Sequence, residues 1–429
     1  MSDIKKAAKS VSLLWIGSLL GSGSTFVIYM ILARELGAEE FGLFGSAFSM
    51  ITIITILSGF GVSQFWLKVF GKEGWEGGRW IVPSIGFILL TMTFFLVMLV
   101  IWVYIGPHEE IMSQILLIMI FYIFGQVSVE IVSSKFQLEE SYTSLAIWQL
   151  APNLSRLILL SIMVYIISYQ IDIINVAWIY AIIGLGFLGI SIYQISKLLV
   201  GSFDLKGHCK SDASQMVSPN IRNVYSEVWP FGIASASAFI YLQSDIIMVS
   251  YIVGDIEAGY YNAAFVIITG IMVLPVVLYQ KFLLPKFHRW AYHDKEKFYR
   301  AYKTGNIVML LLGGGVMICL LSLSGLVVLY VFGVEYQKSI PVLNILAAII
   351  PVNFLAYSVG STLVTRGNMK IKAYLMSLVA FINVSLNVVL IPVFAASGAA
   401  IATVLSSVIL LILYYMAAQK IVFNTGKIC

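Results

Sequence analysis

Cysteine, histidine and nucleotide-binding motifs are scarce or absent in this 429-residue chain. Its three cysteines, Cys209, Cys319 and Cys429, lie far apart and form no C-x-x-C pair, so neither a disulfide framework nor a zinc site is indicated. Its four histidines fall in predicted loops without the spacing of metal ligands. No Walker A sequence occurs, so ATP is not the direct energy source within this chain. The sequence therefore predicts no cofactor and no metal.

Charged residues are also scarce, and this scarcity indicates that lipid surrounds much of the chain. Only 11% of the residues are charged, against about 25% in soluble proteins, while 60% are hydrophobic and the mean hydropathy is +0.95. Apolar runs long enough to cross a bilayer recur along the chain, and a helix satisfies its own backbone hydrogen bonds where no water is available. The sequence predicts an all-α polytopic membrane protein.

The apolar runs divide the chain into twelve predicted transmembrane helices. Their ranges are 10–33, 42–67, 80–106, 112–134, 143–168, 173–196, 225–253, 258–280, 304–332, 341–364, 373–393 and 397–419. The longest polar stretch follows the sixth span and predicts a cytoplasmic linker at 200–224. We therefore expect an N-lobe at 1–199 and a C-lobe at 225–429, with six helices in each.

Lysine and arginine collect on one side of this map. With the N-terminus inside, all 26 of these residues except Arg34, Lys338 and Arg156 fall on the inner side. The positive-inside rule then predicts that both termini are cytoplasmic. Since the basic residues lie beside spans, they favour contact with anionic membrane lipid over binding of nucleic acid.

A repeated segment relates the two predicted lobes. The stretch "GAEEFGLFGSAF" at 37–48 is echoed by "GDIEAGYYNAAF" at 254–265, and both fall in the outer turn between the first two helices of a lobe. Because six is an even number, the lobes are expected to insert in the same orientation, as parallel repeats around a central cavity. The shared glycines are expected to permit positive φ angles and close helix contact.

Three charged residues within predicted spans are candidate functional residues, because each costs about 2.5–3.5 kcal/mol at a helix centre. Arg156 lies near the middle of the fifth span, and its planar guanidinium suits phosphate oxygens. Asp245 and Glu130 are carboxylates that can exchange a proton when their solvation changes. The alternative is structural pairing, such as an ion pair between Arg156 and Glu130.

Side-chain amides extend the candidate site beyond these charges. A carbohydrate path would use amides at several depths, whereas a packed helical bundle seldom needs so many. The candidate substrate-binding residues are Arg156, Asn153, Gln126, Gln243, Asn353 and Asn383.

Three segments resemble those of bacterial polysaccharide-unit flippases. "ILARELGAEEFGLFGSAF" is similar to the family signature at the end of the first helix, and "DIIMVSYIVGDIEAGYYNAAF" looks like its counterpart in the second half. "TRGNMKIKAYLMSLVAFINVSLNVVLIPVFAASGAAIATVLSS" is similar to the family's eleventh and twelfth helices. Taken together, the ordered motifs and the twelve spans cover most of the chain.

The resemblance implies an O-antigen or related flippase of the multidrug/oligosaccharidyl-lipid/polysaccharide exporter superfamily. Such a protein is not an enzyme; it moves an undecaprenyl-diphosphate-linked oligosaccharide from the cytoplasmic to the periplasmic leaflet of the inner membrane by alternating access, driven by an H+ or Na+ gradient. The prenyl tail is expected to stay in membrane lipid, and the polymerase and chain-length proteins of the pathway are candidate partners. We assign Arg156 to the diphosphate or an acidic sugar, and Asp245 or Glu130 to ion coupling; the family motifs do not assign these roles.

Two other functions stay open from the sequence. A multidrug exporter of the same superfamily usually carries an acidic residue in its first helix, and this chain has none there. An O-antigen polymerase, which is a membrane enzyme acting on lipid-linked sugars, usually displays a large periplasmic loop, and the outer loops predicted here are short. Both alternatives are therefore less favoured than a flippase.

Overall fold

The structure is a computed structural model of the full chain. It describes residues 2–167, 171–205, 218–276, 278, 279, 283, 287, 294–363 and 369–423. Side chains are described from residue 15 onward, except at 295 and 369.

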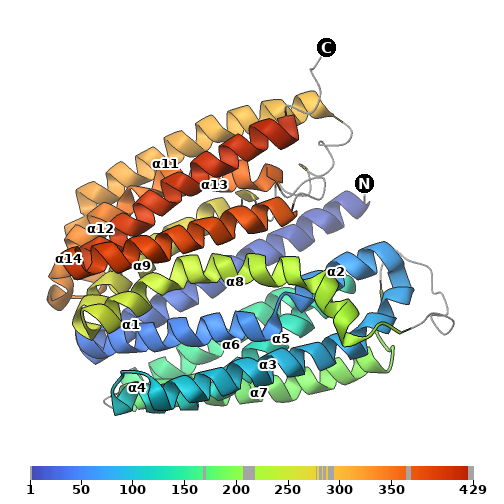
Figure 1. The fold of residues 1–429 in the computed structure, drawn as a ribbon, viewed down its shortest axis with the longest axis horizontal. Helices are drawn as coiled ribbons and strands as arrows, with labels where there is room; N and C mark the ends of the chain where they lie inside the picture. The colour runs from blue at the N-terminus through green and yellow to red at the C-terminus, as the bar shows by residue number, and fades with distance from the viewer. Residues whose placement is uncertain are drawn as a thin grey trace. The chain divides into compact units, whose positions relative to one another are not determined.

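Every regular element among the described residues is helical (Figure 1). The first half contains α1 (Ser2–Gly59), α2 (Val62–Glu73), η1 (Gly74–Trp80), α3 (Ile81–Ile105), α4 (Glu110–Ile118), α5 (Ile120–Leu138), α6 (Tyr142–Ser161), η2 (Ile162–Ile166) and α7 (Ile173–Leu199). The second contains α8 (Ile221–Ile252), α9 (Asp255–Val276), α11 (Lys295–Val331), η5 (Val334–Lys338), α12 (Ser339–Ala347), α13 (Ile349–Leu363), α14 (Met369–Ala417) and η7 (Ala418–Phe423).

By length and composition, eight helical segments of the described chain could cross a membrane, or nine when the bent pair Val334–Ala347 and Ile349–Leu363 counts as one span. Two of the eight exceed a single crossing: Trp15–Ile105 overlaps the first three predicted spans, and Lys370–Phe423 contains the last two. Every predicted span thus has a helical counterpart, although the predicted ends at 280 and 364 lie outside the described residues. The predicted all-α fold with many spans is confirmed.

Two of the long helices, α1 and α14, each contain a backbone kink that lies between successive predicted spans. Within α1 the break is Gly37, with φ 75° and ψ 176°. Its repeat counterpart, Gly254, has φ 127° and precedes α9. Both angles are in the region that favours glycine, which explains why the repeat keeps glycine at this turn. Within α14 the break is Ala395, with φ 50° and ψ −135°.

The chain forms two compact units. Unit 1 comprises Met1–Ile28 and Ala47–Phe239, and unit 2 comprises Tyr29–Ser46 and Ile240–Cys429. Both α1 and α8 are long enough to contribute to each unit, so the division passes through these helices. The lobes expected from the sequence divide at 200–224 instead, and residues 206–217 of that linker lie outside the described part of the chain.

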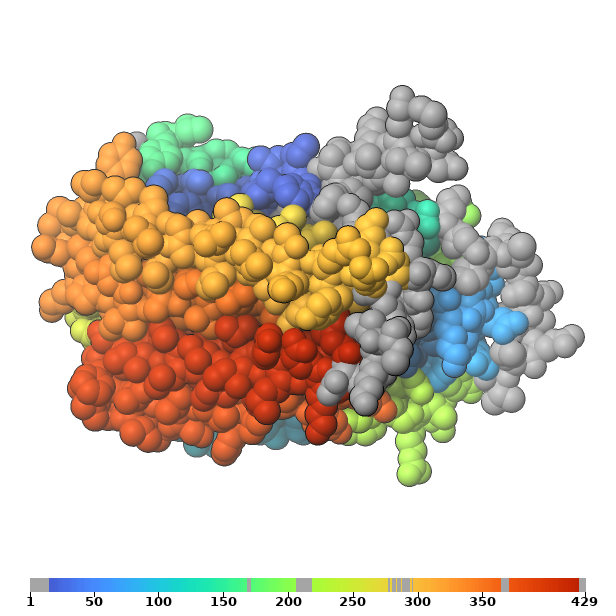
Figure 2. All heavy atoms as spheres, turned by 90° about the horizontal axis from the view of Figure 1, so that it is seen from above, coloured from blue at the N-terminus to red at the C-terminus, as the bar shows by residue number. Residues whose placement is uncertain are grey.

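Each unit is a layered bundle of its own helices. In unit 1, α5 packs against α6 and α7, and in unit 2, α13 packs against α11 and α14. Figure 2 shows α11 (gold) and α14 (red) forming the face of unit 2 that is turned to the viewer. Many of the exposed large apolar side chains of unit 2 belong to these two helices, including Leu311 and Phe381. Such a surface suits contact with lipid tails.

The second pair of repeated glycines meets inside unit 2. A methyl group on Gly42 would overlap the backbone of Asp255 and Gly259, and one on Gly259 would overlap the carbonyl of Ala38. The residues of these contacts are related by the same offset of 217 positions, because Ala38 corresponds to Asp255 and Gly42 to Gly259. The contact between α1 and α9 is therefore symmetric under the repeat, and only residues without a side chain let the two helices approach so closely.

We predict that Gly42→Ala and Gly259→Ala each destabilise the protein, because the added methyl group meets backbone that cannot move aside. Overpacking of this kind costs about 1–3 kcal/mol. Gly315→Ala is the matched control, since α11 leaves open space at that position. Melting temperatures of the detergent-solubilised variants provide the measurement, and equal melting temperatures for all three would contradict the close crossing.

Candidate functional site

A polar cavity of about 490 Å³ lies within unit 1. Side chains from α1, α2, α5, α6 and α8 line it. Its polar lining consists of Ser63, Gln64, Gln126, Glu130, Ser133, Ser134, Gln137, Gln149, Asn153 and Ser235. Five amides and four hydroxyls surround one carboxylate, so the cavity offers many uncharged hydrogen-bonding groups and a single negative charge.

Helical periodicity explains why these residues share one cavity. On α5 the polar positions include Gln126, Glu130 and Gln137, and on α6 they include Gln149 and Asn153. Spacings of three, four and seven residues place side chains on one face of a helix. The two helices therefore each present a polar stripe to the same space.

Apolar packing behind the cavity fixes the relative positions of α5 and α6. Val129, Val132 and Trp148 form a buried cluster, against which Phe136 and Phe187 pack. The indole nitrogen of Trp148 also donates a hydrogen bond of 3.1 Å to the carbonyl of Val129. This contact satisfies the one polar atom of the tryptophan side chain and fastens α6 to α5.

Glu130 is the only acidic residue that lines this cavity. Its carboxylate lies near Gly59, at the end of α1. Among the described residues, no ion pair joins it to Arg156 or to another cation. The pairing of Arg156 with Glu130, which was the structural alternative, is therefore wrong. The guanidinium contacts Tyr122 of α5, Asn153 of α6 and Tyr180 of α7 instead.

Arg156 is buried between two aromatic rings. Its guanidinium carbon lies 5.0 Å from the ring centre of Tyr122 and 4.7 Å from that of Tyr180. Phe48 packs against both tyrosines, with ring centres 5.6 and 5.4 Å away. One terminal nitrogen of Arg156 donates to Asn153 Oδ1 at 2.9 Å, while Nε has no hydrogen-bond partner among the described residues. The hydrogen bond links the guanidinium to an amide of the polar cavity.

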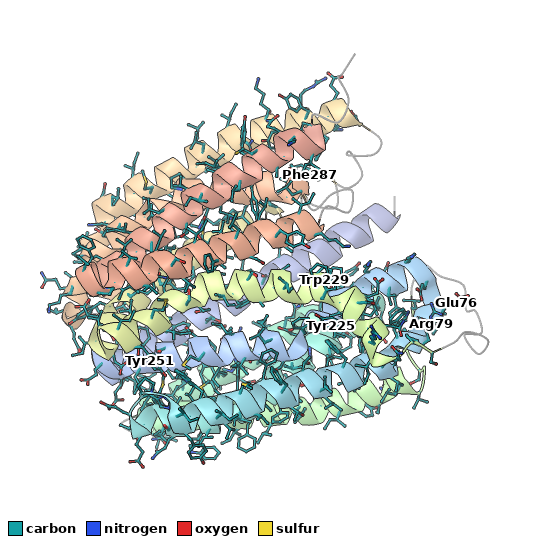
Figure 3. All side chains as sticks on the ribbon, viewed as in Figure 1. Glu76, Arg79, Tyr225, Trp229, Tyr251 and Phe287 are labelled. Carbon is teal, nitrogen blue, oxygen red and sulfur yellow. The ribbon has the colours of Figure 1, made fainter. Side chains whose placement is uncertain are left out.

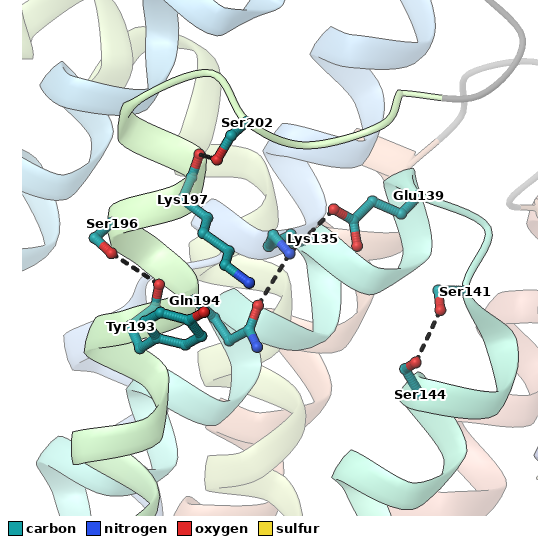
Figure 4. A network of polar contacts seen from close by, with 9 residues as sticks. All are labelled: Lys135, Glu139, Ser141, Ser144, Tyr193, Gln194, Ser196, Lys197 and Ser202. Carbon is teal, nitrogen blue, oxygen red and sulfur yellow. Dashed lines mark hydrogen bonds and ion pairs between the residues drawn. The ribbon is translucent and has the colours of Figure 1, made fainter.

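A second buried cation, Lys135, lies near the C-terminal end of α5 (Figure 4). Its ammonium is 3.0 Å from Glu139 and donates to Gln194 of α7 at 3.1 Å. This side chain is only 5% exposed, and its contacts with Glu139 and Gln194 fasten α5 to α7. It is therefore a less suitable ligand-binding cation than Arg156.

Unit 2 contains a separate polar cluster around Asp245. This carboxylate is 1% exposed and accepts hydrogen bonds from Tyr261 of α9 at 2.6 Å and from Asn387 of α14 at 2.6 Å. Thr403, also of α14, donates to the same carboxylate. Asn387 also approaches Asn383, at 3.3 Å. No Lys or Arg neutralises Asp245 among the described residues, so three neutral donors stabilise its negative charge.

The amides of this cluster retain unused hydrogen-bonding capacity. Asn387 Oδ1 and Asn383 Nδ2 are buried without a partner among the described residues. Asn383 Oδ1 accepts from Ser244 at 3.2 Å. An orphaned acceptor oxygen beside a buried carboxylate fits a small cation or a proton as the missing partner.

The structure gathers the predicted site residues into two groups. Gln126, Glu130, Asn153 and Arg156 lie together in unit 1, and Asp245 and Asn383 lie together in unit 2. The two other candidates, Gln243 of α8 and Asn353 of α13, are half-buried in unit 2, outside both groups.

Sequence reasoning missed several members of both groups. Gln64, Gln137 and Gln149 line the cavity, and the spacing of polar residues on α5 and α6 could have identified the last two. Tyr261 and Thr403 complete the Asp245 cluster from distant parts of the chain, and no local pattern indicates them.

A family model described as polysaccharide biosynthesis protein matches residues 7–290. An uncharacterized membrane protein of Methanocaldococcus jannaschii is 23% identical over 95% of this chain and 96% of its own length.

Solved structures of the multidrug/oligosaccharidyl-lipid/polysaccharide superfamily share this fold. The lipid II flippase MurJ, in an inward closed conformation, matches with a TM-score of 0.73 and 14% identity over 95% of this chain and 87% of that one. A superfamily transporter from Pyrococcus furiosus matches with a TM-score of 0.69 and 13% identity over 96% and 95%. An outward-facing multidrug transporter of the MATE family has a TM-score of 0.67 and 14% identity over 96% and 95%.

We predict measurable coupling between Arg156 and the ring of Tyr122. In a double-mutant cycle with Arg156→Met and Tyr122→Leu, the coupling should be about 1–2 kcal/mol, since a desolvated cation gains about that much from an aromatic face. Tyr122→Phe keeps the ring and should retain most of the coupling. Denaturation of the detergent-solubilised protein by a harsh detergent measures the free energies of unfolding, and additive effects would show that the ring and the guanidinium are independent.

Proposed function

Because this chain belongs to the family of polysaccharide biosynthesis proteins, we propose that it is a flippase for undecaprenyl-diphosphate-linked oligosaccharide repeat units. The cargo moves from the cytoplasmic to the periplasmic leaflet of the bacterial inner membrane by alternating access. Both termini are cytoplasmic in this proposal, as the distribution of Lys and Arg predicts. The family and the fold support a membrane flippase or transporter over an enzyme.

The observation that carries the proposal is the cavity lined by amides and hydroxyls in unit 1. A sugar presents many hydroxyl groups, each able to donate and accept, and side-chain amides and hydroxyls can do the same. Such groups are costly inside a membrane protein unless they have partners. A saccharide headgroup supplies those partners in a way that a hydrocarbon or a compact aromatic cation does not.

Arg156 supplies the positive charge that a diphosphate requires. Its planar guanidinium can hold two phosphate oxygens at once, and the rings of Tyr122 and Tyr180 keep it extended without neutralising it. Its bond to Asn153 joins it to the saccharide-binding amides. We therefore assign Gln126 and Asn153 to the sugar and Arg156 to the diphosphate or an acidic sugar.

Asp245 is the carboxylate best suited to ion coupling. It is buried, lacks a cationic partner among the described residues and lies beside an orphaned amide oxygen. A proton or a Na+ ion would supply the missing positive charge, and buried carboxylates with this character often take part in transport. Glu130 is the second candidate, because it is the one carboxylate among the residues described as lining the polar cavity.

The fold alone does not choose the cargo. Multidrug transporters share it, so the choice of a lipid-linked saccharide rests on family membership and on the amide-rich cavity. With this cargo, the polymerase and the chain-length protein that act on the exported units would be functional partners.

We predict that Arg156→Ala strongly reduces flipping while the amount of protein stays unchanged. In a strain lacking its own copy of the gene, the wild-type protein should restore surface polysaccharide, and Arg156→Ala should reduce the restored amount at least about tenfold, the loss expected when a charge-assisted contact of about 1.5–3 kcal/mol is removed. Arg300→Ala is the matched control, since Arg300 pairs with Glu296 on the exposed surface. Full restoration by Arg156→Ala at equal protein level would remove Arg156 from the mechanism.

We predict that Asp245→Asn removes the response to the coupling ion. In the wild type, exchanging choline for Na+ at constant ionic strength should raise the melting temperature if Na+ is the ion, and a change of pH should shift it if the proton is. Asp245→Asn should show neither response, while Glu130→Gln should keep the wild-type one. The reverse result would assign coupling to Glu130.

A further inference from the structure

Unit 1 contains a second hollow, an open groove of about 880 Å³. Side chains of α3 between 87 and 95 form most of its wall, and Phe60 and Tyr225 complete it. Tyr225 lies on the N-terminal part of α8, one turn before Trp229 (Figure 3). The groove faces outward, because Leu89 and Leu90 in its wall are 54% and 60% exposed.

The chemistry of the groove suits hydrocarbon. Phe60 contacts Phe87 edge to face, with ring centres 6.0 Å apart, and Phe87 lies 6.4 Å from Tyr225. The hydroxyl of Thr91 donates to the carbonyl of Ser58 at 2.7 Å, so this polar atom of the wall is already satisfied. A molecule bound in the groove would therefore make mainly apolar contacts and few hydrogen bonds.

The groove and the polar cavity adjoin the same break in the chain. Phe60 lines the groove, and the next residue, Gly61, lines the polar cavity. Here α1 ends and α2 begins, and the ring of Phe60 packs on Gly232 of α8, which also contributes Ser235 to the cavity. A molecule with a polar head and an apolar tail could thus occupy both hollows, with its two parts on either side of this break.

We propose that the groove holds the polyprenyl chain of the cargo while the saccharide and diphosphate occupy the polar cavity. This inference rests on the proposed function, and it places the prenyl chain on α3 and α8 of unit 1. The methyl branches of a prenyl chain pack against aromatic rings, and the adjoining cavity matches a saccharide head. A phospholipid acyl chain would fit the groove, but its small head leaves the amides of the cavity without partners.

Tail length separates groove binding from head binding. The probes are undecaprenyl diphosphate and geranyl diphosphate, added to the purified full-length protein in detergent micelles that contain no phospholipid. Leu90→Trp fills the groove without touching the polar cavity. Its matched control is Val97→Trp, on the same helix and 50% exposed but outside the groove.

Wild type should bind undecaprenyl diphosphate more tightly than geranyl diphosphate. Leu90→Trp should weaken binding of the long probe by about tenfold or more, because each methylene kept from apolar surface forfeits favourable transfer free energy. Binding of the short probe should not change, and Val97→Trp should behave as wild type with both.

Three results would overturn the proposal, and only the third would also contradict the proposed function. If Leu90→Trp binds the long probe as wild type does, the groove is not the tail site, although the proposed function stands. If added phosphatidylcholine competes with the long probe at equal concentration, the groove is a general lipid site. If wild type binds neither probe, the proposed function fails as well.

Discussion

A polar side chain inside a bilayer must be hydrogen-bonded by protein or lie beside water, because hydrocarbon offers neither donor nor acceptor. This constraint explains the distribution of polarity in the chain. Several isolated hydroxyls are satisfied locally, as when Thr52 and Thr55 donate to carbonyls four residues earlier. Many of the larger polar groups collect in two places, the cavity beside Arg156 and the cluster around Asp245. Burying polar groups within a membrane costs free energy, so these two places are the candidate functional sites.

The fold was predictable because its cause is local. Each apolar run must become a helix in lipid, so a helical counterpart for each predicted span in the described part of the chain follows without knowledge of any tertiary contact. The sequence named Gln126, Glu130 and Asn153 because polar groups are costly within apolar spans, and the structure places all three beside one cavity. Arg156 was identified because a charge within a membrane span costs free energy. Its partners Tyr122 and Tyr180 were not identified, because they belong to other helices. The donors to Asp245 likewise depend on tertiary contacts that join α8 to α9 and α14.

The internal repeat accounts for the symmetric contact in unit 2, and the position where the repeat differs is informative. Gly42 and Gly259 occupy equivalent positions and face each other, so both must lack a side chain. One turn later the equivalent pair is Gly45 and Asn262, and a methyl group on Gly45 would overlap the Asn262 amide. Two side chains cannot fill the same space on a symmetry axis. The repeat therefore has glycine in both copies where the two backbones touch, at Gly42 and Gly259. It has different residues where the side chain of one copy, Asn262, occupies the space beside the glycine of the other, Gly45.

The donors to Asp245 would give the proposed ion binding a direct mechanical consequence. Tyr261 belongs to α9, Asn387 precedes the kink of α14 at Ala395, and Thr403 follows it. An ionised carboxylate on α8 therefore fastens three helical segments at one point. Protonation would remove one acceptor, and a Na+ ion would take over oxygen contacts, so either event changes how firmly these segments are held. Since the kink lies between two of the donors, the two halves of α14 are where a change of charge at Asp245 would first become a change of shape.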